Sequence, residues 1–386
     1  MDEKSIAINL SIKLVHCGNK NCVDLKDKRH KNMFFMPMGL FSIASEVKKC
    51  GFDIEIVHLD LEPDEKVETI IDLKNIDAIG LDCHWANQAY NIICLAEYIK
   101  KIKPEIFIFI GGFTSSFFSS EIIEKYNFVD GVIRGDGELS VVKLCQLLYD
   151  RKLGKKNISF STVDNLVWRD EKKIVSNSFS GVVTEKFFNS YDFADISLLR
   201  NWEMYRDLSN YPVSQSLTLK KIFFLQIGRG CIYNCSFCGG NSKAQLAMNN
   251  RHFQIIRSHE AVINTIKKAA DYGFESFYIC FDFEQSETWF CELFDKIKCL
   301  NLEISFILGF WHLPSKNLVE NISKNLKNTS IEISLETANE ELRIKNKDKR
   351  LFFSNNELEE LLSFIQTKQN IYVQLFFGYF LQIGRA

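Results

Sequence analysis

Three closely spaced cysteines lie in the segment Gly228-Arg229-Gly230-Cys231-Ile232-Tyr233-Asn234-Cys235-Ser236-Phe237-Cys238-Gly239-Gly240. Thiolates in a Cys-x₃-Cys-x₂-Cys spacing are ligands for an iron–sulfur cluster or for zinc. A four-iron cube usually takes four thiolates, so three leave one iron open to another molecule. A structural zinc loop is the alternative, with His252 or Cys280 as the fourth ligand, although the chain has no second Cys-x₂-Cys pair.

The chain around and after this loop alternates short apolar runs with amphipathic stretches. We expect strands at 222–227, 276–281, 303–308, 330–335 and 371–376, separated by helices at 258–272, 287–300, 315–326 and 355–368. This order predicts a partial (β/α) barrel whose active site lies on loops at the carboxyl ends of the strands. The final residues 381–386 repeat 225–230 nearly letter for letter. We therefore expect a truncated or mis-assembled C-terminus, with chance similarity as the alternative.

The N-terminal part of the chain shows the same alternation. Strands are expected at 6–15, 54–59, 78–82, 106–110 and 131–134, and helices at 40–50, 90–102, 120–125 and 141–150. Such alternation predicts a doubly wound, flavodoxin-like parallel sheet covered on both faces. Ligands of these sheets bind at the carboxyl ends of the strands.

The expected organisation is therefore a doubly wound domain at 1–150, a connector with a small hairpin at 151–220, and the partial barrel at 221–386. The chain has 386 residues and a formal net charge of −2, which gives no electrostatic reason to expect nucleic acid or anionic membrane as a partner. No apolar run has the length of a membrane span, and no signal peptide is recognisable. The sequence favours a soluble, cytoplasmic protein whose 12 cysteines are thiols or metal ligands.

The cysteine spacing, with an aromatic residue before the third cysteine and glycines after it, resembles the radical S-adenosylmethionine (SAM) superfamily. The resemblance implies that the three thiolates bind a [4Fe–4S] cluster and that SAM chelates the fourth iron through its amino and carboxylate groups. One electron then cleaves SAM to a 5′-deoxyadenosyl radical. By the same pattern, SAM would be contacted by residues of the loop and of the later strand ends: Phe237, Gly239, Gly240, Asp282, Glu336 and Arg343. The ordinary alternatives are a helix-start acid for Glu336 and a solvated helix face for Arg343, and Gly378 matches a family glycine after the fifth strand.

Three N-terminal segments resemble the cobalamin-binding domains that precede radical SAM barrels. They are residues 36–40 (MPMGL), 110–115 (IGGFTS) and 132–138 (VIRGDGE). The resemblance implies that cobalamin lies against bare backbone and small side chains there, with contacts from Gly111, Gly112, Thr114, Gly135, Gly137 and Glu138.

Histidine and the scattered cysteines carry weaker signals. The Asp-x-His-x-x-Gly motif that supplies a lower cobalt ligand is absent, and His84 follows a later strand, so packing beside Trp85 or lining the pocket for the nucleotide tail is the favoured role. Surface or core roles are the default for the six other histidines: His16, His30, His58, His252, His259 and His312. Most remaining cysteines are expected to be small buried hydrophobes, with Cys17 and Cys22 less certain.

The resemblance implies a cobalamin-dependent radical SAM enzyme that methylates an unactivated carbon of a small molecule or peptide. Its expected partners are that substrate and an electron donor such as flavodoxin or ferredoxin. One alternative is a tRNA methylthiotransferase, which needs a second cysteine cluster. The other is a non-catalytic protein that binds a cluster or cobalamin, which a shortened barrel would favour.

Overall fold

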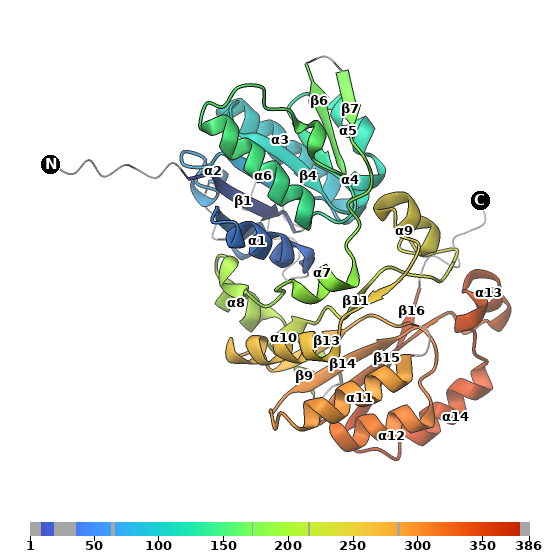
Figure 1. Cartoon of the computed structure of the whole chain (residues 1–386). Coiled ribbons are helices and arrows are strands. Elements are labelled where there is room, and N and C mark those ends of the chain that lie inside the picture. Colours follow the sequence, from blue (N-terminus) through green and yellow to red (C-terminus); the bar gives the residue numbers. More distant parts are fainter. Residues whose placement is uncertain are drawn as a thin grey trace. The chain divides into compact units, whose positions relative to one another are not determined.

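The computed structural model describes residues 9–18, 36–62, 66–171, 173–214, 217–283 and 286–378. Two compact units make up the chain (Figure 1). The first contains residues 1–183, 191–205 and 247–250, and the second contains 184–190, 206–246 and 251–386. Strand residues 6–8, Cys22, His30 and the repeated segment 381–386 lie outside the described residues.

The first unit is built on a seven-stranded sheet in the order β2-β1-β3-β4-β5-β6-β7. Its five parallel strands are β1 (Ser11–His16), β2 (Asp53–His58), β3 (Ala78–Asp82), β4 (Phe107–Gly111) and β5 (Gly131–Ile133). The order 2-1-3-4-5 is that of flavodoxin-like sheets, so the predicted fold class is confirmed. The order in which strands are added changes direction between β1 and β3, because β2 lies on one side of β1 and the later parallel strands lie on the other. This is the switch point where such folds bind ligands.

Helices cover both faces of this sheet. Strand residues such as Val15 and Ile79 share one apolar core with the side chains of α2 (Val67–Ile70), α3 (Ala89–Ile102) and α5 (Ser119–Lys125). On the other face, α1 (Gly39–Lys49) and α6 (Glu138–Lys152) pack together (Figure 1). An apolar period near 3.6 residues predicted α1, α3, α5 and α6, whereas the four-residue helix α2 was not expected.

The small hairpin is part of the first sheet. Strands β6 (Leu166–Asp170) and β7 (Lys173–Ser176) extend it antiparallel from β5. These residues belong to the range 151–220 that the sequence suggested as a connector. Among its described residues that range also contains four short helices: η3 (Phe160–Thr162), α7 (Glu185–Ser190), η4 (Ile196–Leu198) and α8 (Trp202–Leu208).

The second unit is built on a five-stranded, all-parallel sheet in the order β10-β13-β14-β15-β16. The strands are β10 (Ile222–Phe224), β13 (Ser276–Ile279), β14 (Ser305–Phe310), β15 (Thr329–Glu336) and β16 (Ile371–Phe377). They alternate with α10 (His259–Asp271), α11 (Ser286–Lys298), α12 (Lys316–Asn325) and α14 (Asn355–Ile365). Within the described residues the sheet is open, as expected of a partial barrel.

A small antiparallel hairpin, β8 (Tyr211–Pro212) with β9 (Thr218–Leu219), packs against one face of this second sheet. Its Leu219 shares an apolar cluster with Ile222 and Ile307 of the sheet. The Tyr211 hydroxyl group bonds Glu332 of β15 and Gln374 of β16, and Tyr278 Oη donates to Glu332 at 2.6 Å. The hairpin therefore fills one end of the face on which Tyr278, Glu332 and Gln374 lie.

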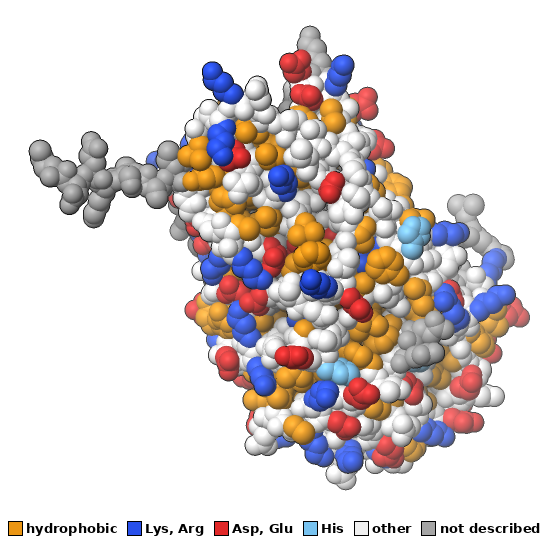
Figure 2. Space-filling view, viewed as in Figure 1, with side chains coloured by type: hydrophobic (Ala, Val, Ile, Leu, Met, Phe, Trp, Pro, Cys, Tyr) orange, Lys and Arg blue, Asp and Glu red, His pale blue; other side chains and the backbone are white. Residues whose placement is uncertain are grey.

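No helix among the described residues is both long and apolar enough to cross a bilayer. On the molecular face drawn in Figure 2, basic and acidic side chains are interspersed, in keeping with the small net charge.

Candidate functional site

The cysteine loop begins directly after the short strand β11 (Gly228–Arg229), which pairs with β12 (Ile255–Ile256). Gly230 has φ +90°, and a Cβ there would lie 2.4 Å from the carbonyl oxygen of Phe253, so only glycine permits this turn. Along the loop Cys231 is half-buried, Cys235 is buried and Cys238 is exposed. The exposure of the three predicted metal ligands therefore differs along the loop and rises from the buried Cys235 to the exposed Cys238.

Backbone amides already point at two of the three sulfur atoms. Asp348 N lies 3.3 Å from Cys235 Sγ, and Gly240 N lies 3.4 Å from Cys238 Sγ. Burial raises the pKa of the Cys231 thiol to about 11 and also raises that of Cys235. A metal must therefore displace protons from these thiols, and the amide donors stabilise the resulting thiolates.

The segment that follows α13 (Glu340–Asn346) holds the loop in place. Asn234 N donates to Asp348 Oδ2 at 2.9 Å, Ser236 N donates to Asn346 O at 2.8 Å, and Arg350 lies over the Tyr233 ring at 4.9 Å. Hydrogen bonding from Arg350 lowers the pKa of Asp348 to about 2, so this carboxylate stays ionised. Sequence reasoning missed this clamp because its two sides are more than one hundred residues apart.

The three thiols of the loop are a suitable ligand set for an iron–sulfur cluster. Among the described residues, no three His, Cys, Asp or Glu side chains converge closely enough to hold one metal ion. In a four-iron cube each thiolate binds a different iron, so the cysteines need only surround a common space. A Cβ on Gly239 would meet nothing within 4 Å, and one on Gly240 would meet only Cys238 Sγ, at 3.9 Å. Phe237 is exposed beside this space, so the predicted SAM contacts at Phe237, Gly239 and Gly240 remain sterically open.

Glu336, at the end of β15, has the conformation expected of a functional residue. Its φ of +64° is rare for a residue with a side chain, and the β15–β16 register shifts between Ser334 and Glu336. Burial raises the pKa of its carboxyl group. A Cβ on Gly378 would lie 2.6 Å from Glu336 Oε2, so the glycine after the fifth strand leaves room for this carboxylate.

Lys347 is a site residue that sequence reasoning missed. It is buried, donates to Ser334 O, and lies over the Phe353 ring at 4.9 Å. Burial lowers its pKa to about 8, and it interacts electrostatically with Glu336, Cys235 and Asp282. A lysine four positions after Arg343 would have been the available signal, because residues at i and i+4 share a helix face.

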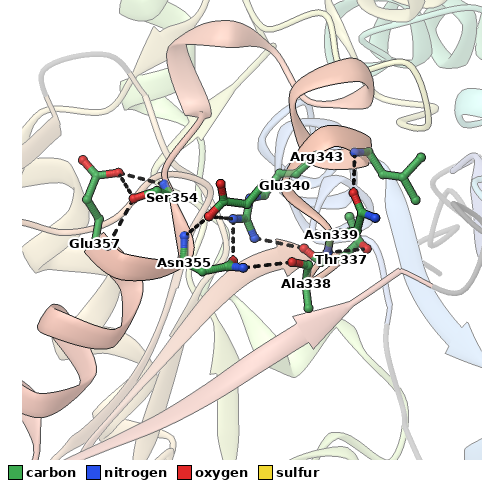
Figure 3. Close-up of polar contacts among 9 residues, drawn as sticks. Thr337, Ala338, Asn339, Glu340, Arg343, Ser354, Asn355 and Glu357 are labelled. Atoms are coloured by element: carbon green, nitrogen blue, oxygen red, sulfur yellow. Dashed lines mark hydrogen bonds and ion pairs between the residues drawn. The ribbon is translucent and has the colours of Figure 1, made fainter.

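Arg343 lies on α13, and both of its terminal nitrogen atoms hold its own segment together. Its Nη1 donates to Thr337 O at 2.9 Å and its Nη2 to Asn355 Oδ1 at 2.7 Å (Figure 3). The guanidinium group also lies 4.9 Å from the Phe353 ring centroid, and the side chain is inaccessible to solvent. Contact between Arg343 and SAM stays a prediction. Lys347, in contrast, interacts electrostatically with Cys235 of the cysteine loop.

Asp282, which follows β13, is also inaccessible and serves as an acceptor for the loop after β14. It receives hydrogen bonds from Trp311 N at 2.7 Å, His312 N at 3.2 Å and Ser286 Oγ at 3.1 Å. Trp311 in turn packs against the apolar cluster of Tyr233 and Cys235. The predicted SAM contact at Asp282 is untested, and this geometry favours an indirect role.

Two of the three predicted cobalamin-binding segments, 110–115 and 132–138, meet at one edge of the sheet of the first unit. Cys83 N donates to Gly111 O at 2.7 Å, Thr114 Oγ1 to His84 O at 3.1 Å, and Gly135 N to Ser116 Oγ at 2.9 Å. The loops after β3, β4 and β5 are thereby joined. This is the edge where parallel sheets bind ligands.

Some glycines at this edge allow neighbouring loops to pack closely, and others leave the backbone accessible to a ligand. Gly112 has φ +107°, and a Cβ there would lie 2.7 Å from the Cys83 carbonyl group. A Cβ on Gly137 would lie 3.0 Å from Ile43, whereas one on Gly111 would meet only Ile133 O, at 3.9 Å. Gly135, with φ +64°, lies against Phe179 and Asn249. Gly111 is thus the glycine with the most open surroundings.

Glu138 is buried under α1, where Ser42 Oγ donates to its carboxylate at 2.6 Å. Direct contact between Glu138 and cobalamin stays a prediction. Burial lowers the pKa of His84, whose ring lies 5.0 Å from Trp85 and 4.8 Å from Phe113. The expected packing of His84 beside Trp85 is confirmed.

His16 and Asp82 form a buried pair at the switch point that sequence reasoning did not anticipate. His16 ends β1 and Asp82 ends β3, and His16 Nδ1 lies 2.6 Å from Asp82 Oδ2. The His16 ring lies 4.6 Å from that of His58, the last residue of β2. Exposed Trp85 lies beside them, so this edge offers an aromatic surface next to a buried polar pair.

Comparison with known protein families also indicates a cobalamin-binding domain in the N-terminal part of the chain. Residues 32–144 match the family described as the B12 binding domain. Hopanoid C-3 methylase from Methylococcus capsulatus is 27% identical over 204 residues, which cover 52% of this chain and 35% of that protein. Anaerobic magnesium-protoporphyrin IX monomethyl ester cyclase from Synechocystis is 22% identical over 213 residues, covering 53% and 38%.

A third relative, cytidylyl-2-hydroxyethylphosphonate methyltransferase from Streptomyces wedmorensis, is 21% identical over 286 residues, covering 63% of this chain and 50% of that protein. The chain thus spans between 35% and 50% of the length of these relatives.

Two solved structures share the fold. Both are of the radical SAM methyltransferase TsrM from Kitasatospora setae, one with cobalamin and a [4Fe–4S] cluster, the other with tryptophan and a SAM analogue. The first has a TM-score of 0.69 and covers 95% of this chain and 66% of its own. The second has a TM-score of 0.67 and covers 94% and 66%. Both are 12% identical to this chain, so the likeness establishes the fold alone.

Proposed function

We propose a function for this chain from the premise that it belongs with the radical SAM proteins that carry a cobalamin-binding domain. The proposed activity is methylation of an unactivated carbon in a small molecule or peptide. One observation carries the proposal: a three-cysteine loop with an open space beside it, on a parallel half-barrel, follows a B12-binding domain in the same chain.

Each proposed cofactor has residues suited to hold it. Cys231, Cys235 and Cys238 would ligate the cluster, and the glycines after them would leave room for SAM. Lys347 interacts electrostatically with both Glu336 and Cys235, and Glu336 and Lys347 would orient the amino and carboxylate groups of SAM. When bound, the cluster supplies the electron that cleaves SAM, and cobalamin supplies a transferable methyl group.

In the first unit, the joined loops after β3, β4 and β5 would hold cobalamin at the edge of the sheet. Gly111 provides open backbone there, and exposed Trp85 provides an aromatic face. Phe117, at the end of α4, and the adjacent Phe118 are also exposed. A large, partly apolar ring system is the ligand class that such an edge favours.

The proposal is tested by anaerobic reconstitution with iron and sulfide, followed by iron counting and electron paramagnetic resonance of the reduced protein. We expect about four irons per chain, a signal that changes when SAM is added, and release of 5′-deoxyadenosine. Cys235→Ala should lose all three properties. The matched control Cys299→Ala, an exposed cysteine outside the loop, should keep them. Zinc without iron, or a cluster indifferent to SAM, would contradict the proposal.

A ring-forming reaction is a second candidate because one relative is a cyclase. Product analysis separates the two, since methyl transfer adds carbon from SAM to the substrate and cyclisation does not. A methylthiotransferase would instead need a second cluster. Cys17, Cys83 and Cys145 of the first unit are buried and lie in three separate places, after β1, after β3 and in α6.

The electron donor is proposed to be a small flavin or iron–sulfur protein such as flavodoxin or ferredoxin. The chemical reason is that the proposed cluster must be reduced by one electron before SAM is cleaved. Reduction of the reconstituted chain by either protein, followed by its paramagnetic signal, tests this partner.

A further inference from the structure

His312 was assigned only a default surface or core role by its sequence, yet it lies beside the candidate SAM site. It follows β14, and its neighbour Trp311 packs against Tyr233 of the cysteine loop with ring centroids 6.0 Å apart. The same Trp311 joins the apolar cluster that contains Cys235. The backbone thus places His312 next to the loop through an apolar contact.

Asp282 fixes the orientation of the His312 ring. His312 Nδ1 lies 2.6 Å from Asp282 Oδ2, and the same oxygen accepts the amides of Trp311 and His312. An inaccessible carboxylate with these donors acts as an acceptor, so the proton on His312 Nδ1 points to it. The other ring nitrogen, Nε2, bonds no residue that the structure describes, and 26% of the side chain is exposed.

The charges around His312 favour a proton on the ring. The groups that act on it are Asp282 after β13, Glu287 of α11 and Lys347 after α13. Burial opposes protonation and Lys347 opposes it too, but the hydrogen bond and charge of Asp282, with Glu287, prevail and raise the pKa of His312. A protonated ring held through Nδ1 presents Nε2–H as a charge-assisted donor.

We propose that His312, held by Asp282, is a SAM-contacting residue whose Nε2–H donates to an oxygen of SAM. Asp282 is then a positioning residue that acts through the ring and does not itself touch SAM. The inference rests on the proposed function, because SAM must bind at the cysteine loop. It also explains why the buried Asp282 is placed at the strand end without being accessible.

The first experiment maps carbethoxylation of each histidine in the reconstituted full-length chain by mass spectrometry, with and without SAM. We expect SAM to slow modification of His312 by about tenfold, as tight occupation of the site requires. Exposed His252 serves as the internal control and should react equally in both samples. Because wild-type protein is used, the result does not depend on a variant that folds.

The second experiment measures SAM affinity by equilibrium dialysis over a range of pH. Wild-type affinity should fall as pH rises through the pKa of His312, because the donor is lost when the ring deprotonates. His312→Gln should bind SAM about tenfold more weakly, the loss expected for one charge-assisted hydrogen bond, and should lose this pH dependence. Asp282→Asn should shift the pH midpoint downward, and His252→Gln should match the wild type.

Two outcomes separate this inference from the proposed function. A chain that binds SAM normally while His312 stays equally reactive, or whose His312→Gln variant keeps wild-type affinity and pH dependence, overturns the inference alone. A chain that assembles the cluster but binds no SAM overturns the proposed function, and the inference falls with it.

Discussion

Glu336 shows how one backbone position can prepare a side chain for a ligand. A positive φ in a residue with a Cβ is unfavourable, so neighbouring structure has to maintain it. Gly378 N donates to Glu336 O at 2.9 Å, and the missing Cβ of the same glycine leaves space for the carboxylate. The two residues therefore act as one unit, although forty-odd positions separate them.

Gly378→Ala tests this unit. The new methyl group would lie 2.6 Å from Glu336 Oε2 and must displace the carboxylate. We expect SAM affinity to fall by about tenfold, comparable to loss of one charged hydrogen bond. Gly39→Ala, where an added Cβ meets nothing within 4 Å, is the control for a neutral substitution. Wild-type SAM binding by Gly378→Ala would contradict the role assigned to Glu336.

We expect substitutions of Lys347 and Arg343 to have different effects on SAM affinity and stability, although both residues are buried cations of the same segment. Lys347→Met should lower SAM affinity by about tenfold, because a charged partner of the ligand is lost while the aliphatic stem is kept. Stability should change little, because loss of the hydrogen bond to Ser334 O is offset by removal of a buried charge. Exposed Lys345→Met is its control and should bind SAM normally. Equilibrium dialysis against labelled SAM measures both.

Arg343→Met should instead lower stability, because Thr337 O and Asn355 Oδ1 lose their donor. The expected cost is about 1–3 kcal/mol for buried groups left unpaired, seen in the thermal unfolding of the second unit. If Arg343→Met unfolds like the wild type but binds SAM poorly, the original sequence prediction for Arg343 is the better one.

Helix α14 illustrates how local chemistry positions a larger element. Ser354 Oγ accepts from Glu357 N at 3.2 Å while Glu357 Oε2 accepts from Ser354 N at 2.7 Å, a reciprocal cap at the first turn (Figure 3). The next residue, Asn355, donates to Ala338 O and accepts from Arg343. The cap thereby connects α14 to the segment that leads from Glu336 to Lys347.

Ser354→Ala should destabilise the second unit by about 1 kcal/mol, the usual cost of a lost N-cap. Ser363→Ala, on the exposed part of the same helix, is the matched control and should be nearly neutral. Thermal unfolding followed by circular dichroism compares the two. Equal midpoints for Ser354→Ala and Ser363→Ala would show that the cap contributes nothing.

Most long helices and strands were predictable, whereas short elements were not. The strand expected at 371–376 is β16 at Ile371–Phe377, and the helix expected at 315–326 is α12 at Lys316–Asn325. Both have apolar periodicity over several turns or residues. The β8–β9 hairpin has only two residues per strand, and the bonds from Tyr211 to Glu332 and Gln374 hold it. No local pattern encodes such distant partners.

The chain as a whole divides its proposed cofactors between two compact units. Cys235→Ala should therefore abolish iron binding while cobalamin binding, measured by its visible spectrum, is unchanged. Trp85→Ala, at an exposed aromatic residue of the first unit, should weaken cobalamin binding and leave iron content intact. Loss of both cofactors in either variant would contradict independent sites.

The sequence by itself predicted the parallel strands of both sheets, which the structure confirms, and it supplied the predicted cysteine ligands and cobalamin-binding segments. Apolar periodicity is a local property, and all three thiols lie in one loop, so neither requires knowledge of distant contacts. Only the tertiary structure decided which polar residues face the loop. Hydrogen bonds to remote groups decide which of these residues is accessible. Arg343 is bonded to Asn355, and Asp282 is bonded to Trp311. A buried side chain must satisfy its hydrogen bonds wherever the fold brings partners, and sequence spacing does not record those partners.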